Sequence, residues 1–232
     1  MKSTIAIVII LIILIGAGAA YYYSAHSALA PTTGTSTPAI VASSTTTTIT
    51  TTTTSNPDTS TWKTNTETQA GFSIAHPANF TAVTNTSTAP TTDWRLNSSD
   101  PGIKVLTLAV PSSFEPKTNF VDATLTVGYS QNTQAIANCL TQSPGSGPLT
   151  ATTTVTINGI NFTVFHSSDV GAGNIYKTTS YRALHAGACY AVEYSVHSAQ
   201  LGNFPPSEGL TQYSDTPIDQ ALDQVVGTFK FL

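Results

Sequence analysis

Four side chains able to bind a metal or transfer a proton recur every four residues: His185, Cys189, Glu193 and His197. On a helix they would form one stripe, and zinc prefers imidazole, thiolate and carboxylate ligands. The residues around them, however, alternate between apolar and polar with a period of two, which predicts a strand. Four strand residues span about 13 Å, too far for ligands held about 2.0–2.3 Å from one metal. We therefore expect no metal site. The alternative to this expectation is an envelope hydrolase or a metal-dependent enzyme that uses His185, Glu193 and His197.

Other residues with catalytic potential are also better explained structurally. The run His166-Ser167-Ser168-Asp169 holds the residue types of a hydrolase triad, but a triad is a spatial arrangement that neighbours along a chain do not form. His76 precedes a proline, as expected where a strand stops. The stretch Gly171-Ala172-Gly173-Asn174 is too short for a dinucleotide-binding loop. The sequence thus predicts no enzyme and no cofactor.

Cys139 and Cys189 are the two cysteines of the chain. An even number of cysteines in an exported domain favours a disulfide between them, and a pair of buried free thiols is the alternative.

Aromatic side chains near expected loops and strand ends indicate an interaction surface, because Trp and Tyr are enriched at binding hot spots. They are Trp62, Trp94, Tyr129, Tyr181, Phe204 and Tyr213. The low-charge stretch 201–213, with Pro205 and Pro206, is either a recognition loop or a packed crossover.

The first sixty residues predict export. Lys2 precedes an uncharged apolar run over residues 5–15, and Tyr21, Tyr22 and Tyr23 follow where a membrane interface would lie. We expect residues 1–27 to form a transmembrane signal anchor with the C-terminal part outside the cytoplasm. The alternative is a cleaved signal peptide and a secreted protein. Residues 28–61, rich in Thr, Ser and Pro, form an expected disordered linker, and residues 62–232 form one exported domain.

The charge content excludes nucleic acid as a partner. Charged residues are 9% of the chain and the net charge is −4, whereas typical domains have about 25% charged residues. Nucleic-acid binding needs clustered cations, which this sequence lacks.

Strand patterns dominate the expected domain. Over 103–110, Ile, Val, Thr and Ala alternate with Lys, Leu, Leu and Val, so both faces of the expected strand have some apolar cover. Over 121–127 the alternation is clean, with Val121, Ala123, Leu125 and Val127 on one face. Asn158-Gly159 between two such runs predicts a hairpin, and a second hairpin is expected over 175–197 with its turn near Ala186-Gly187.

Two helices are expected among these strands. The first is a weak pattern over 132–140. The second begins after a Thr216 cap, with Pro217 at its first position, and ends before a final strand. Its expected buried face consists of Ile218, Leu222, Val225 and Val226. The class is α+β, a mostly antiparallel sheet with helices packed on its faces.

Three short motifs resemble the PsbP/Mog1-like domains of exported bacterial proteins. They are Gly-Phe-Ser-Ile-x-His-Pro from Gly71, Cys-Tyr-x-Val-x-Tyr from Cys189, and a terminal helix running into Gly-Thr-Phe-Lys-Phe. Members commonly have Tyr where this chain has His76. The resemblance implies an α/β/α sandwich and a role in protein binding or assembly, with no shared catalytic residues.

The sequence thus predicts a membrane-anchored extracytoplasmic protein whose PsbP/Mog1-like domain binds an envelope protein or a surface ligand without catalysis. Besides the enzyme named above, a purely structural surface protein is an alternative.

Overall fold

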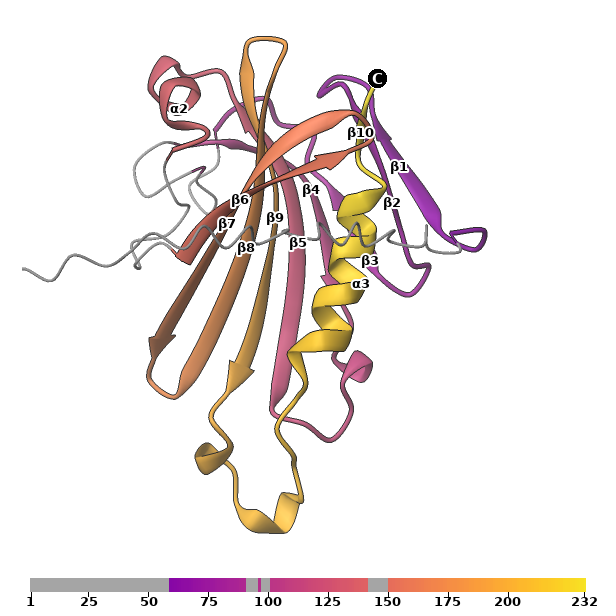
Figure 1. The fold of residues 1–232 in the computed structure, drawn as a ribbon. Coiled ribbons are helices and arrows are strands. Elements are labelled where there is room, and N and C mark those ends of the chain that lie inside the picture. Colours follow the sequence, from indigo (N-terminus) through magenta and orange to yellow (C-terminus); the bar gives the residue numbers. More distant parts are fainter. Residues whose placement is uncertain (1–58, 91–95, 97–100, 142–149) are drawn as a thin grey trace, which may run out of the picture. The chain divides into compact units, whose positions relative to one another are not determined.

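Two antiparallel sheets make up most of the domain in the computed structural model, which describes residues 59–90, 96, 101–141 and 150–232 (Figure 1). The larger sheet has the strand order β3-β4-β5-β9-β8-β7-β6 and the smaller one β1-β2-β10. In chain order the strands are β1 (Lys63–Glu67), β2 (Phe72–His76), β3 (Thr81–Thr84), β4 (Ile103–Val110), β5 (Phe120–Ser130), β6 (Thr150–Ile157), β7 (Ile160–Gly171), β8 (Asn174–His185), β9 (Ala188–Ala199) and β10 (Lys230–Phe231). The helices are α2 (Thr133–Asn138) and α3 (Asp215–Gly227), with short 3-10 turns at Ser112–Phe114, Leu201–Asn203 and Pro206–Glu208. The mostly antiparallel α+β class is as predicted.

Three consecutive two-residue turns join β6, β7, β8 and β9. Each has two residues with positive φ: Asn158 (49°) and Gly159 (80°), Ala172 (49°) and Gly173 (79°), Ala186 (46°) and Gly187 (74°). Such type I′ turns match the twist of paired strands, so each pair forms a tight hairpin. The two hairpins predicted from the sequence are present. The stretch 171–174, which is too short for a dinucleotide-binding loop, contains the turn of a third hairpin.

Helix α3 covers one face of the large sheet, which we call the helix-facing face. Its Ile218, Leu222, Val225 and Val226 are fully buried, as the periodicity predicts. The predicted cap was wrong by two residues: Ser214 is the N-cap, so Thr216 and Pro217 lie within the first turn. Asp215 instead places a carboxylate there, where the helix dipole favours a negative charge.

A local irregularity in β5 changes one predicted face. Ala123, Leu125 and Val127 are buried as expected, but Val121 is 37% exposed and Phe120 is buried in its stead. The pairing of β5 with β9 shifts register between Phe120 and Asp122, and such a bulge reverses the alternation of side chains.

The other face of the large sheet, which we call the opposite face, carries α2 at one end. Asn132 caps this helix by accepting hydrogen bonds from the backbone N–H groups of Gln134 and Ala135. Leu96, Ala135, Cys139, Cys189 and Ala191 form a small buried cluster beneath it. Compared with the expected α/β/α sandwich, the described residues contain few helices: α3 is the long one, and the six-residue α2 lies on the opposite face.

Within the described residues no helix is long and apolar enough to cross a membrane. The predicted anchor at 1–27 and the predicted linker up to residue 58 lie outside those residues. The described residues belong to one compact unit within Thr54–Leu232.

Candidate functional site

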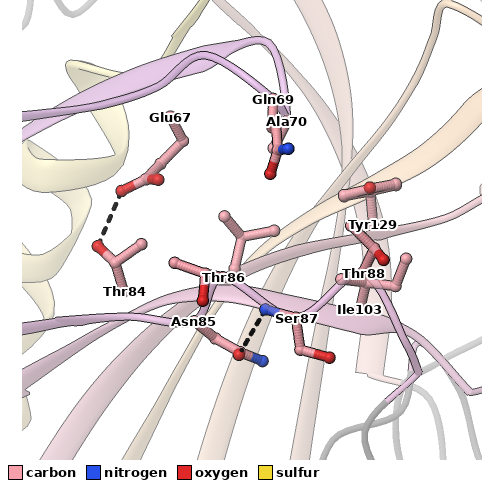
Figure 2. Close-up of a pocket in the computed structure, with 11 residues that line it drawn as sticks. Glu67, Gln69, Ala70, Thr84, Asn85, Thr86, Ser87, Thr88, Ile103 and Tyr129 are labelled. Carbon is pink, nitrogen blue, oxygen red and sulfur yellow. Dashed lines mark hydrogen bonds between the residues drawn. The ribbon is translucent and has the colours of Figure 1, made fainter.

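A pocket of about 200 Å³ opens between the β1–β2 hairpin and the segment that follows β3 (Figure 2). The hairpin supplies Glu67, Gln69 and Ala70 on one side. Residues 84–88 lie on the other side, and Ile103, Val105 and Tyr129 complete the lining from the large sheet. Segments far apart in the sequence therefore meet at one site.

Backbone hydrogen bonds hold both walls in place. Gly71, with φ of 68°, closes the hairpin turn, and its N–H donates to the carbonyl of Thr68 at 3.3 Å. Across the pocket, the Asn85 N–H donates to the Val105 carbonyl at 2.7 Å and its side-chain amide to the Lys104 carbonyl at 3.0 Å. Asn85 Oδ1 also accepts from the Ser87 N–H at 3.0 Å, a turn that shapes this wall. The pocket is thus a built feature of the fold.

Tyr129 and Tyr190 connect the sheet to the hairpin wall. Their rings stack with centroids 5.4 Å apart and an interplanar angle of 26°. The Tyr190 hydroxyl donates to the carbonyl of Ala70 at 2.9 Å, and burial raises the pKa of this phenol. Because the tyrosine remains neutral, it keeps its proton for this bond and fixes the hairpin above the ring of Tyr129.

The lining is polar but nearly uncharged. Glu67 supplies the one ionisable carboxylate among the described lining residues, which include no Lys, Arg or His. Thr84 Oγ1 donates to Glu67 Oε1 at 2.9 Å, across the opening of the pocket. Hydroxyl and amide groups of Gln69, Asn85, Thr86, Ser87 and Thr88 provide both donors and acceptors. This arrangement suits a small, uncharged, hydrogen-bonding ligand.

The four residues of the supposed metal stripe do not come together. Cys189, Glu193 and His197 share the opposite face of β9, whereas the turn at Ala186-Gly187 places His185 on the helix-facing face. There the His185 ring stacks on Phe231, with centroids 3.7 Å apart. Among the described residues no group of three or more His, Cys, Asp or Glu could hold a metal ion.

Glu193 and His197 instead have separate polar neighbours on the opposite face. Glu193 Oε2 lies 3.9 Å from the guanidinium of Arg182, whose side chain is fully buried and donates from Nε to Ser180 at 3.0 Å. Burial lowers the pKa of Arg182 to about 10, and the nearby Glu193 partly opposes that change. His197 lies 3.2 Å from Asp122 and 2.8 Å from Asn174, and stacks on Tyr176.

The other sequence candidates are placed as structural residues. His76 ends β2, is buried, and lies 2.8 Å from the Pro77 carbonyl and 3.2 Å from Asn65 Oδ1. His166 and Asp169 alternate along β7 and so point to opposite faces, which prevents a triad with Ser167 or Ser168.

Some of the residues predicted to form an aromatic interaction surface are buried in the core. Trp62, Tyr129 and Phe204 are half-buried, and Trp94 lies outside the described residues. Tyr181 and Tyr213 are 9% and 5% exposed, so their assignment to an exposed patch was wrong: both face the core beside α3. Tyr129 lines the pocket, and it is the residue of this set that joins the candidate site.

The stretch 201–213 has features of both predicted alternatives. Its ends are fastened: the Gln200 N–H donates to the Gly173 carbonyl at 2.8 Å, and Asn119 hydrogen-bonds Thr211 and Tyr213. Its middle, including Pro205 and Pro206, is exposed.

The predicted disulfide is present between Cys139 and Cys189, with an S–S distance of 2.04 Å. It fastens the end of α2 to β9.

Asp223, itself exposed, is a further polar centre that the sequence analysis missed, and it accepts hydrogen bonds from two buried tyrosines. Its Oδ1 accepts hydrogen bonds from the hydroxyls of Tyr181 at 2.7 Å and Tyr194 at 2.9 Å. Burial, reinforced by the adjacent carboxylate, raises the pKa of both phenols. The spacing of Asp215, Asp219 and Asp223 along α3 was the available signal, but it does not reveal which side chain reaches the sheet.

No protein-family model and no curated protein matches this chain. A solved structure from Bacteroides thetaiotaomicron is similar over 74% of the chain, with a TM-score of 0.41 and 11% identity, and the chain spans about half (49%) of that structure's length. The solution structure of the cyanobacterial PsbP, CyanoP, from Synechocystis sp. PCC 6803 is similar over 74% of this chain and 93% of its own, with a TM-score of 0.39 and 10% identity. The cyanobacterial protein belongs to the family that the sequence motifs resemble. Similarity at this level concerns the fold and carries no information on function.

Proposed function

We propose that this chain is a membrane-anchored extracytoplasmic protein whose C-terminal domain binds a partner molecule without catalysing a reaction. The observation that carries the proposal is the pocket between the β1–β2 hairpin and residues 84–88. Its walls are fixed by backbone hydrogen bonds, and its lining offers many hydrogen-bonding groups but little charge. Preformed concave sites with a few placed polar groups are typical of ligand binding.

The proposed location rests on the sequence alone. Residues 1–27 have the length, apolarity and single flanking Lys2 of a signal anchor, and a Thr-rich linker follows. The disulfide fits an oxidising compartment outside the cytoplasm.

The arrangement of the three motifs supports a divergent PsbP/Mog1-like module. The first forms β2, the second forms β9, and the third forms the end of α3 with β10. Strand β10 pairs with β2, so the motifs at the start and the end of the domain are neighbours in one sheet. Binding or assembly without shared catalytic residues is what that resemblance implies.

The enzyme alternative loses its main support because His185 faces away from Glu193 and His197. An active site built from these residues would need convergent side chains. If a measured activity of this protein fell on alanine substitution of Glu193 or His197 while the fold was kept, the enzyme alternative would replace our proposal.

A photo-crosslinking experiment tests the binding function. A diazirine amino acid replaces Gln69 at the pocket rim, and in a matched control it replaces the exposed Tyr176 on β8. Both full-length chains are expressed in intact cells of a suitable host and irradiated. We expect an adduct at position 69 that is absent at position 176 and that persists at high salt, since the pocket is nearly uncharged. Equal labelling at both positions, or none at position 69, would contradict the proposal.

A further inference from the structure

The lining of the pocket narrows the class of ligand, an inference that rests on the proposed binding function. We propose that the pocket binds one uncharged pyranose ring, either a free sugar or the terminal sugar of a glycan.

Size limits the ligand to a single small ring. The volume of about 200 Å³ is below the range of about 300–1,000 Å³ typical of pockets for drug-sized molecules. The opening between the hairpin and residues 84–88 would let one sugar enter while the remainder of a glycan extends into solvent.

The charges around the pocket disfavour anionic ligands. The described lining residues include no cationic side chain, so a phosphate or a carboxylate would lose its hydration without gaining an ion pair. A cationic amine would have Glu67 as its carboxylate partner. That carboxylate is half-exposed and already accepts a hydrogen bond from Thr84, and an ion pair at an exposed carboxylate contributes little.

The hydrogen-bonding groups match adjacent sugar hydroxyls, each of which donates one hydrogen bond and accepts others. Glu67 retains a second carboxylate oxygen, which can accept from a hydroxyl group. The Gln69 amide and the hydroxyls of Thr86, Ser87 and Thr88 can both donate and accept. Such mixed groups complement a polyol better than an ion.

Tyr129 and Ile103 give the pocket its apolar part. The C–H groups of a pyranose ring present an apolar surface that packs on an aromatic side chain. Because Tyr129 is held by stacking on Tyr190, this surface is rigid before a ligand arrives, which reduces the entropy lost on binding.

Saturation-transfer NMR on the purified full chain tests the assignment. An amine-oxide detergent is used, because the headgroups of maltoside detergents would compete with the ligand. The probes are the methyl pyranosides of glucose, galactose, mannose and N-acetylglucosamine, and the corresponding free sugars, each up to about 50 mM. Nα-acetyl-lysine methyl ester is the cationic comparison. We expect at least one sugar to bind with a Kd of about 1 mM, as a ligand with about a dozen heavy atoms should. Binding of the glycoside together with the free sugar would indicate a glycan end, and binding of the free sugar alone would indicate a monosaccharide ligand.

Variants locate that binding in the pocket. Tyr129→Ala should weaken it about tenfold or more, Tyr129→Phe should retain most of it, and Gln69→Ala should weaken it about two- to tenfold, the loss of one hydrogen bond. Gln69 is exposed in a turn, so this variant keeps the fold even if Tyr129→Ala does not. Tyr176→Ala, which removes an exposed tyrosine elsewhere, should leave binding unchanged.

Three results would overturn the inference: no sugar binding at the highest concentration, preference for the amine, or binding insensitive to Gln69→Ala and Tyr129→Ala. If a crosslink at position 69 is nevertheless observed, the binding function stands and only the ligand class is wrong. If neither is observed, both proposals fail.

Discussion

One carboxylate oxygen of Asp223 links helix α3 to two strands through hydrogen bonds. Its Oδ1 accepts from Tyr181 on β8 and Tyr194 on β9, and these tyrosines are 9% and 4% exposed. Removing the acceptor leaves two buried hydroxyls without this partner. Asp223→Ala should therefore lower the free energy of unfolding by about 2–4 kcal/mol, measured by urea denaturation.

Two variants make the Asp223 experiment specific. Asp223→Asn keeps an oxygen that can accept, so its loss of stability should be smaller. Asp169→Ala, at an exposed position of β7, should change stability by less than about 0.5 kcal/mol. A loss at Asp223 no greater than at Asp169 would show that the two hydrogen bonds contribute nothing.

Asp219 is the carboxylate of α3 whose ionisation the fold opposes. Burial raises its pKa, and the neighbouring carboxylates Asp215 and Asp223 raise it further. Because the folded pKa exceeds the unfolded one, ionised Asp219 destabilises the fold at neutral pH, and this cost disappears as the pH falls below both pKa values. Asp219→Asn should therefore raise stability by about 0.5–1 kcal/mol at pH 7, from two like-charge pairs one turn away.

The pH dependence is the check on Asp219. Urea denaturation of the wild type and of Asp219→Asn should give nearly equal stability at about pH 3, below the ordinary pKa of an aspartate. An advantage of the variant that persists at that pH would mean that the charge of Asp219 is not the cause.

At the scale of elements, the turns between β7, β8 and β9 contain avoidable strain. Ala172 and Ala186 adopt φ of 49° and 46°, a left-handed conformation that costs a non-glycine residue about 1–2 kcal/mol. Glycine avoids that cost but loses more entropy on folding, by about 0.5–1 kcal/mol. Ala186→Gly should thus stabilise the domain by about 0.5–1 kcal/mol, visible as a higher midpoint in thermal unfolding.

The turn between β6 and β7 provides the contrast. Asn158 also has a positive φ, but its side-chain amide donates to the carbonyls of Gly227 at 3.0 Å and Phe229 at 2.8 Å, where α3 ends. Asn158→Gly relieves the same conformation and removes both hydrogen bonds, so it should lower the midpoint. If both glycine variants shift the midpoint in the same direction, the turn conformation alone decides the result.

Strands with an apolar pattern were predictable from the sequence, whereas the edge strands β1 and β3 were not. In β5 and in the second half of β9, buried apolar residues alternate with more exposed ones, because one face packs in the core. Strand β1 consists of the polar residues Lys-Thr-Asn-Thr-Glu, and all four residues of β3 are exposed. Both are held by backbone pairing to a neighbour, which leaves no apolar pattern to detect.

For the molecule as a whole, the disulfide ties helix α2 to the opposite face of the large sheet. Cys139 at the end of α2 is bonded to Cys189 on β9 across 50 residues. In the chain-entropy model, closing such a loop contributes about 4 kcal/mol. We expect a reducing agent to lower the free energy of unfolding by up to that amount in urea denaturation. A Cys139→Ala/Cys189→Ala double variant should start lower and show no response to the reducing agent. A response in that variant would show that the reductant acts elsewhere.

The candidate site could not be predicted from spacing. The pocket combines residues 67, 69, 70, 84–88, 103, 105 and 129, which are polar or common apolar types without a motif. Conversely, the regular spacing of His185, Glu193 and His197 suggested a site, but the tight turn at Ala186-Gly187 places them on different faces. Of the candidate interaction residues named from the sequence, only Tyr129 lines the pocket. The other lining residues could not be predicted, because their segments come together only in the complete sheet.

The position of β1 has a mechanical consequence for an anchored chain. Strand β1 is the first strand among the described residues and an edge strand. If the chain is anchored as proposed, a pull on its N-terminal side would therefore load the β1–β2 ladder before any other. Separation would begin at the pair Lys63–His76 and reach Glu67–Phe72 last. Glu67 lines the pocket, so a bound ligand would be released only after the rest of β1 had separated from β2. The domain would therefore keep its ligand during the first steps of unfolding under tension.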